Sequence, residues 1–107
     1  MPSDPAVRLV VVAYNSRPVL GAFFDSLATA GVDDLEVVVV DNHSADPPRQ
    51  DELPGYGRLI IAEKNLGYGG AANLGLAGST APWLVVANPD VVWEPDSLAR
   101  LIERAEA

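Results

Sequence analysis

Cysteine is absent from this sequence of 107 residues, and histidine occurs once, as His43. The absence of cysteine excludes disulfide frameworks, thiolate nucleophiles and zinc sites built from cysteine. A single imidazole with no histidine or cysteine partner makes a poor metal site. We therefore expect His43 to be a solvated loop residue.

Basic side chains are also scarce. The chain has 7 Lys and Arg residues against 15 Asp and Glu residues, which gives a formal net charge of -8. The isoelectric point is about 4.3. Nothing in this composition neutralises a phosphate backbone, so a nucleic-acid partner is excluded. An anionic ligand would need help from backbone amides or from a cation.

Long hydrophobic runs are missing as well. The runs at residues 9–13 and 37–40 are far too short to span a bilayer, and the first residues do not have the pattern of a signal peptide. The sequence therefore predicts a cytoplasmic domain. Its 49% hydrophobic content is sufficient for the core of one domain.

Short apolar runs are present at four places, namely residues 8–13, 36–40, 58–62 and 83–87. Their continuous hydrophobicity is typical of strands that are covered on both faces of a parallel sheet. Apolar residues at helical spacing follow the first run and occur again at the end of the chain. The two apolar stripes are formed by Val19, Leu20, Phe23, Phe24 and Leu27, and by Leu98, Leu101, Ile102 and Ala105. The order predicts an α/β fold with three layers around an open, mainly parallel sheet.

Polar or glycine-rich residues follow each of the four apolar runs. In open α/β sheets, ligands bind outside the carboxyl ends of the strands, so these residues are candidates for a binding site. They occupy positions 14–16, 41–46, 65–70 and 88–90. Residues 46–57 are rich in proline and acidic side chains and predict a surface loop with a turn of helix.

Each of these motifs also has a purely structural interpretation. Asp41 could accept hydrogen bonds from a base or a ribose, or it could form an Asx turn with the residues after it. Asp90 at the sheet edge could reach a divalent cation, or residues 88–90 could form an ordinary turn. Asn73 could contact a sugar or phosphate, or be tolerated within a helix.

The glycines of residues 67–78 also have both a functional and a structural interpretation. Gly67 and Gly69 resemble a dinucleotide-binding fingerprint, but that fingerprint should follow the first strand of its unit, and here it follows the third. Glycines before a helix still allow the backbone to approach an anion. Gly75 and Gly78 are predicted to serve the packing of a helix on the sheet.

Together, four segments resemble glycosyltransferase family 2, whose fold is called GT-A, and in particular its rhamnosyltransferase-like branch. They are residues 10–15, 39–46, 65–73 and 84–90, so the resemblance covers nearly the whole chain. In that branch Asn-x-Gly-(Phe/Tyr)-(Gly/Ala) and Asn-Pro-Asp are typical. The resemblance implies transfer of a sugar, such as rhamnose or a related hexose, with inversion. It also implies a role in cell wall or polysaccharide biosynthesis.

The resemblance also implies roles for single residues. Asp41 would bond the pyrimidine base of a dTDP- or UDP-linked sugar. Asp90, the last residue of an Asn-Pro-Asp that replaces Asp-x-Asp, would bind Mg²⁺ or Mn²⁺. The implied nucleotide-binding residues are Ala13, Tyr14, Asn15, Asp41, Asn42, Asn65, Gly67, Asn73 and Asn88.

Residues 1–107 would then be the N-terminal, donor-binding part of a GT-A domain without its acceptor-binding part. No residue matches the general base of the family, so we expect the chain to bind nucleotide weakly and to transfer no sugar by itself. The acceptor of the full enzyme would be a glycan or a lipid-linked molecule. An unpaired edge strand would permit a homo-oligomer. The location would be cytoplasmic, or peripheral at the membrane for the full-length enzyme.

A different class of protein remains as an alternative, namely a non-catalytic α/β module that binds nucleotide or a partner. A receiver-like module would need acidic residues after the first strand and a lysine after the last. Here residues 14–16 are Tyr-Asn-Ser, and the only lysine, Lys64, follows the third run. A nucleotidyltransferase would need a basic, glycine-rich loop after the first strand, which is also missing.

Overall fold

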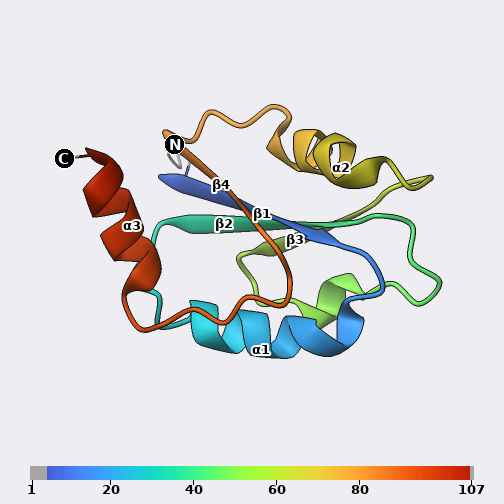
Figure 1. Cartoon of the computed structure of the whole chain (residues 1–107), viewed down its shortest axis with the longest axis horizontal. Helices are drawn as coiled ribbons and strands as arrows, with labels where there is room; N and C mark the ends of the chain where they lie inside the picture. The colour runs from blue at the N-terminus through green and yellow to red at the C-terminus, as the bar shows by residue number, and fades with distance from the viewer. Residues whose placement is uncertain (1–4, 107) are drawn as a thin grey trace.

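A sheet of four parallel strands lies at the centre of the molecule (Figure 1). The computed structural model describes residues 5–106. The strands are β1 (Val7–Ala13), β2 (Leu35–Asp41), β3 (Gly57–Ile61) and β4 (Trp83–Ala87). Within the described residues their order across the sheet is β3-β2-β1-β4. The prediction of four parallel strands is confirmed, with bounds that differ by at most one residue at either end.

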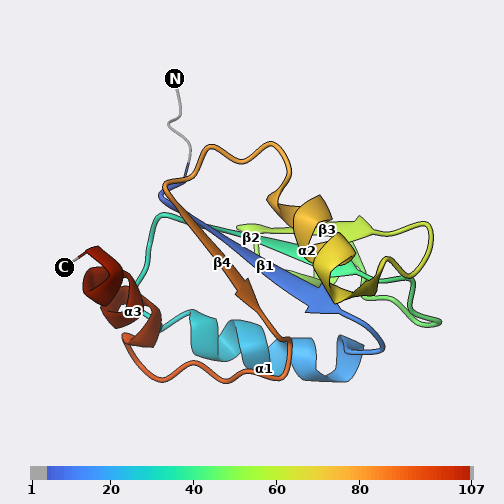
Figure 2. The same cartoon turned by 45° about the horizontal axis from the view of Figure 1, so that its top comes forward.

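Helices cover both faces of this sheet (Figures 1 and 2). They are α1 (Arg17–Leu27), the single 3₁₀ turn η1 (Gln50–Glu52), α2 (Gly67–Leu76) and α3 (Ser97–Glu106). The helices α1 and α3 pack on one face through a core that includes Phe23 and Leu98. The helix α2 packs on the other face through Ala71 and Ala72. The predicted three-layer α/β arrangement is therefore confirmed.

The continuous apolar runs reflect this double covering. In β1, Leu9 and Val11 belong to the core under α1, whereas Val10 and Val12 belong to the core under α2. Successive side chains of a strand point to opposite faces, so a strand between two helical layers is apolar at most of its positions. All seven residues of β1 are buried, and the one charged side chain among them, Arg8, donates to Glu36 and to Gly75 O.

The stripe predicted for α1 is buried at four of its five positions. Phe23 is fully buried, and its ring lies edge-on to Phe24 at 5.5 Å and to Trp93 at 6.1 Å between centroids. Val19, the fifth member, is exposed instead, although its neighbour Leu20 belongs to the core.

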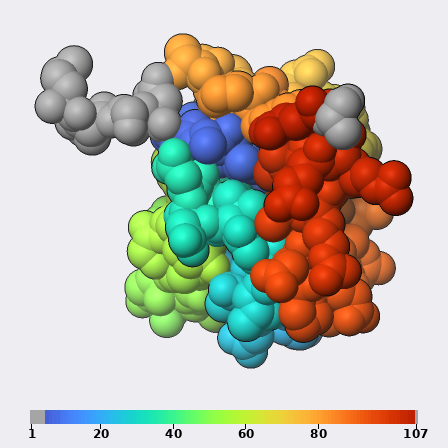
Figure 3. Space-filling model, turned by 90° about the vertical axis from the view of Figure 1, so that its left-hand side faces the viewer, coloured from blue at the N-terminus to red at the C-terminus, as the bar shows by residue number. Residues whose placement is uncertain are grey.

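The helix α3 lies at the opposite end of the sheet from the carboxyl ends of the strands. In Figure 3 it lies beside the segment that follows α1. Backbone bonds join the two, from Asp96 N to Thr29 O at 2.9 Å and from Ala99 N to Ala30 O at 3.1 Å. The carboxyl edge of the sheet is therefore left to the loops.

Gly75 and Gly78 are glycines for different structural reasons. A Cβ at Gly75 would lie 2.5 Å from Val10 Cγ1 and 3.0 Å from Val40 Cγ2, so the packing interpretation is confirmed there. It is wrong for Gly78, where a Cβ would meet open space. The φ of Gly78 is +74°, a left-handed conformation that glycine adopts without strain.

Gly75→Ala is expected to lower the free energy of unfolding by about 1–3 kcal/mol, because the added methyl overpacks the contact of α2 with the sheet. Gly69→Ala is the matched control on the same helix, since a Cβ there meets nothing within 4 Å. It should raise stability by about 0.5–1 kcal/mol through helix propensity. Urea denaturation measures both changes, and equal effects of the two variants would contradict the packing argument.

Candidate functional site

The strand order creates a crevice at one edge of the sheet. From β1 the chain moves to β2 and β3 on one side, and it later returns to place β4 on the other side of β1. In open α/β sheets, ligands bind at such a reversal, outside the carboxyl ends of the two strands. A hollow of about 430 Å³ lies there, lined by Asn15, Ser16, Pro18, Val19, Asn88, Pro89 and Asp90.

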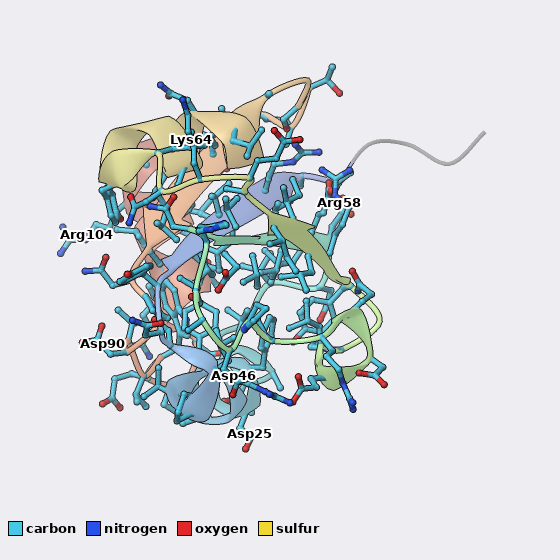
Figure 4. The ribbon with its side chains drawn as sticks, turned by 90° about the vertical axis from the view of Figure 1, so that its right-hand side faces the viewer. Asp25, Asp46, Arg58, Lys64, Asp90 and Arg104 are labelled. Carbon is cyan, nitrogen blue, oxygen red and sulfur yellow. The ribbon has the colours of Figure 1, made fainter. Side chains whose placement is uncertain are left out.

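The loop after β4 supplies one side of this hollow. Asn88 and Asp90 are both exposed, and Asn88 O accepts a hydrogen bond from Val91 N at 3.3 Å, which closes a turn. Within residues 5–106, the Asp90 carboxylate has no hydrogen-bond or ion-pair partner. Figure 4 looks onto this edge, with Asp90 beside the beginning of α1. The turn therefore presents an uncommitted carboxylate to the hollow.

The loop after β1 supplies the other side. Ala13 is fully buried at the end of β1, whereas Tyr14 is 54% exposed. Asn15 has a φ of +53°, and its backbone N–H donates to Ser44 Oγ at 2.7 Å. Of the three residues predicted to bind nucleotide here, only Asn15 lines the hollow. Tyr14 is exposed outside that lining, and Ala13 lies within the core.

The two polar residues at the end of β2 are buried. Both Asp41 oxygens accept bonds from Ser44, from its N–H at 2.8 Å and from its hydroxyl at 2.7 Å. Asn42 accepts a bond from Leu66 N at 2.7 Å and donates to Gly67 O at 3.2 Å. In this arrangement Asp41 shapes its own loop and Asn42 holds the beginning of α2. Their contact with a nucleotide stays a prediction.

The remaining predicted residues lie around α2, which packs over β1 and β2 on the face of the sheet opposite α1. Asn65 Oδ1 accepts a bond from Gly67 N at 2.8 Å, and Gly67 is exposed with a φ of +72°. Asn73 is exposed on α2. The structure thus brings Asn15, Asn88 and Asp90 to one hollow, and it leaves Asn65, Gly67 and Asn73 outside the lining of that hollow.

Sequence reasoning missed Arg17, which begins α1 beside the hollow. Its guanidinium is 2.8 Å from Asp46 Oδ1 and 3.0 Å from Glu52 Oε2. The pKa of Glu52 is lowered, first because its carboxylate accepts the backbone N–H of Arg49 and then because Arg17 donates to it. The Arg17 charge is already matched by two carboxylates, so a further anion would need another cation. A lone arginine after Asn-Ser gives no sequence signal for this ion pair.

The sequence also did not predict Pro18 and Val19 in the lining of the hollow, or the bond between Ser44 and Asn15. Pro18 and Val19 line the hollow, although helical spacing alone assigns Val19 to the core. Their place follows from α1 beginning at the sheet edge, directly after β1. Ser44 lies in the candidate segment at residues 41–46, but nothing in its local sequence indicates a bond to Asn15.

Two further observations concern metals and membranes. Among residues 5–106 there is no group of three or more His, Asp or Glu side chains that could hold a metal ion. No helix in the same range is both long and apolar enough to cross a membrane.

The parallel order and the hollow at the reversal define a class of protein, an open α/β fold with a ligand-binding crevice at the carboxyl ends of its strands. The sequence profile described as "Glycosyl transferase family 2" matches residues 9–107. The chain therefore belongs to glycosyl transferase family 2, which confirms the resemblance and the GT-A fold.

Two curated relatives are similar to nearly the whole chain. The succinoglycan biosynthesis protein ExoO of Rhizobium meliloti is 43% identical over 96% of this chain and 30% of its own length. The N-acetylglucosaminyl-diphospho-decaprenol L-rhamnosyltransferase of Mycobacterium tuberculosis is 37% identical over 91% of this chain and 36% of its own length. The chain therefore spans about a third of the length of these relatives.

Solved structures agree on the fold. A mannosyltransferase of Pyrobaculum calidifontis, in complex with GDP-Man and Mn²⁺, superposes with a TM-score of 0.81 and 26% identity. The match covers 94% of this chain and 32% of that one. TarS of S. aureus, at 23% identity and a TM-score of 0.73, shows the same fold.

Proposed function

We propose that this chain is the donor-binding part of an inverting glycosyltransferase. It would bind a dTDP- or UDP-linked sugar, rhamnose or a related hexose, for transfer to a glycan or a lipid-linked acceptor. The observation that carries the proposal is the hollow between β1 and β4, with Asn15, Asn88 and Asp90 in its lining. The rhamnosyltransferase relative supports the choice of sugar.

We further propose that Asp90 binds Mg²⁺ or Mn²⁺ together with the donor. A magnesium ion is usually held by one or two carboxylates plus substrate phosphates rather than by an all-protein cage. One carboxylate without a partner, in a region with no larger ligand cluster, fits an ion shared with a diphosphate. When bound, such an ion stabilises the diphosphate leaving group. The Mn²⁺ and GDP-Man of the mannosyltransferase neighbour support this assignment.

The residues of the chain itself would bind and orient the donor. Asn15 and Asn88 each carry an amide with two donors and an acceptor, which suits sugar and phosphate oxygens. The net charge of -8 opposes a diphosphate, and Arg17 is engaged by Asp46 and Glu52. Donor binding would therefore depend on the cation.

We also propose that the general base lies outside these 107 residues and that this chain transfers no sugar by itself. In the cell it would work in the cytoplasm, or peripherally at the membrane as part of a full-length enzyme. Leu84 and Val86 are exposed on β4, which supports self-association through that edge.

Calorimetry with UDP and dTDP, each with and without Mn²⁺, tests the proposal. We expect at least one nucleotide to bind, and Mn²⁺ to tighten the binding. Binding of neither nucleotide under either condition would reject donor binding and favour the non-catalytic module. Robust sugar transfer by the isolated chain would reject its proposed inactivity.

A further inference from the structure

We infer that Ser44 is a positioning residue for the hollow, because its hydroxyl fixes the backbone of Asn15. Ser44 follows β2 and does not line the hollow itself. It acts on the loop after β1 from a loop 29 residues further along the chain. Its expected effect on nucleotide binding rests on the proposed function, whereas its effect on Asn15 does not.

The direction of each hydrogen bond at Ser44 is determined by its partners. The Ser44 hydroxyl donates its single proton to Asp41 Oδ1, at 2.7 Å. The lone pairs of Ser44 Oγ are then free to accept from Asn15 N–H, also at 2.7 Å. The Ser44 N–H donates to the second Asp41 oxygen at 2.8 Å, which fixes the position of the serine.

The conformation of Asn15 explains why it needs this support. Its φ of +53° lies in the left-handed region, which non-glycine residues seldom occupy, although asparagine adopts it more readily than most. Such a conformation persists when the surrounding structure holds it. The bond from Ser44 anchors the Asn15 backbone, and the buried Asp41 carboxylate anchors Ser44. The side chain of Asn15 is thereby held at the hollow that also includes Asn88 and Asp90.

The loss of this hydroxyl has two consequences. Ser44→Ala leaves the Asn15 N–H without its acceptor, so its amide hydrogen should exchange at least about tenfold faster. With Asn15 no longer held, the dissociation constant for the Mn²⁺-nucleotide should rise about tenfold, the size of one lost hydrogen bond. Ser44→Thr keeps the hydroxyl and should restore both values.

Ser26→Ala is the matched control. Ser26 also makes two bonds through its hydroxyl, donating to Phe23 O at 3.0 Å and accepting from Trp93 N at 2.8 Å. It does not line the hollow. This variant should lower the melting temperature while leaving the Asn15 amide and the nucleotide affinity unchanged.

Hydrogen exchange by NMR and calorimetry with UDP and dTDP in the presence of Mn²⁺ measure these effects on the whole chain. Unchanged Asn15 exchange in Ser44→Ala, or loss of protection in Ser44→Thr as well, would overturn the inference. If the wild type binds nucleotide, faster Asn15 exchange in Ser44→Ala without weaker nucleotide binding would also overturn the inference. If the wild type binds no nucleotide, the proposed function fails, and the exchange result alone decides whether Ser44 holds Asn15.

Discussion

Asp90→Ala is expected to remove the effect of Mn²⁺ on nucleotide binding and to leave binding without metal nearly unchanged. In the wild type the carboxylate lies in the lining of the hollow without a partner among residues 5–106. Even outer-shell partners of a metal ligand contribute about 10–100-fold to metal affinity, so the loss of a direct ligand should weaken Mn²⁺-dependent binding by more than about 100-fold. Calorimetry with and without Mn²⁺ measures the difference.

A matched control separates this effect from a change in net charge. Asp25→Ala removes the same charge from an exposed aspartate on α1 that does not line the hollow. Asp25 and Asp90 are both labelled in Figure 4. Asp25→Ala should retain the full response to Mn²⁺. If Asp90→Ala retains it too, Asp90 is not the metal ligand.

Phe23→Ala is expected to lower the free energy of unfolding by about 3–5 kcal/mol, the usual cost of truncating a large buried aromatic side chain. Phe23 is fully buried and packs edge-on against two other aromatic rings. Domains of this size are stable by only about 5–15 kcal/mol, so this variant should be partly unfolded at moderate urea concentrations. Urea denaturation followed by circular dichroism measures the change.

Val19→Ala provides the comparison from the same predicted stripe. Val19 is 39% exposed, and its truncation should change stability by less than about 0.5 kcal/mol. A large loss for Val19→Ala together with a small loss for Phe23→Ala would show that the core is elsewhere.

The fold was predictable because its signal is local. A strand buried on both faces is apolar at most of its positions, and residues 37–40 are four valines in succession. The polar residues after each strand could also be recognised from the sequence as candidates for a binding site, since parallel strands place all their carboxyl ends at one edge. These two patterns were sufficient for the α/β class, whereas the family was predicted from the resemblance of the four motif-bearing segments.

The assembly of the site was not predictable in the same way. Which strand ends share a hollow depends on the order of the strands, and no local pattern encodes that β4 lies beside β1. For this reason Asn65 and Gly67 were grouped with Asp90, although the structure places them outside the lining of the hollow. The left-handed Asn15 depends on a serine from another loop, so it too has no local signature.

The pairing of β1 with β4 also has a consequence for the order of folding. Val7 pairs with Leu35 and with Trp83, and the second partner lies far later in the chain. Distant pairings form slowly because a long loop must close first, and synthesis delivers β4 after β1, β2 and β3. The hollow therefore comes into existence only when β4 docks. A ligand that occupies the hollow stabilises the finished sheet over every earlier intermediate.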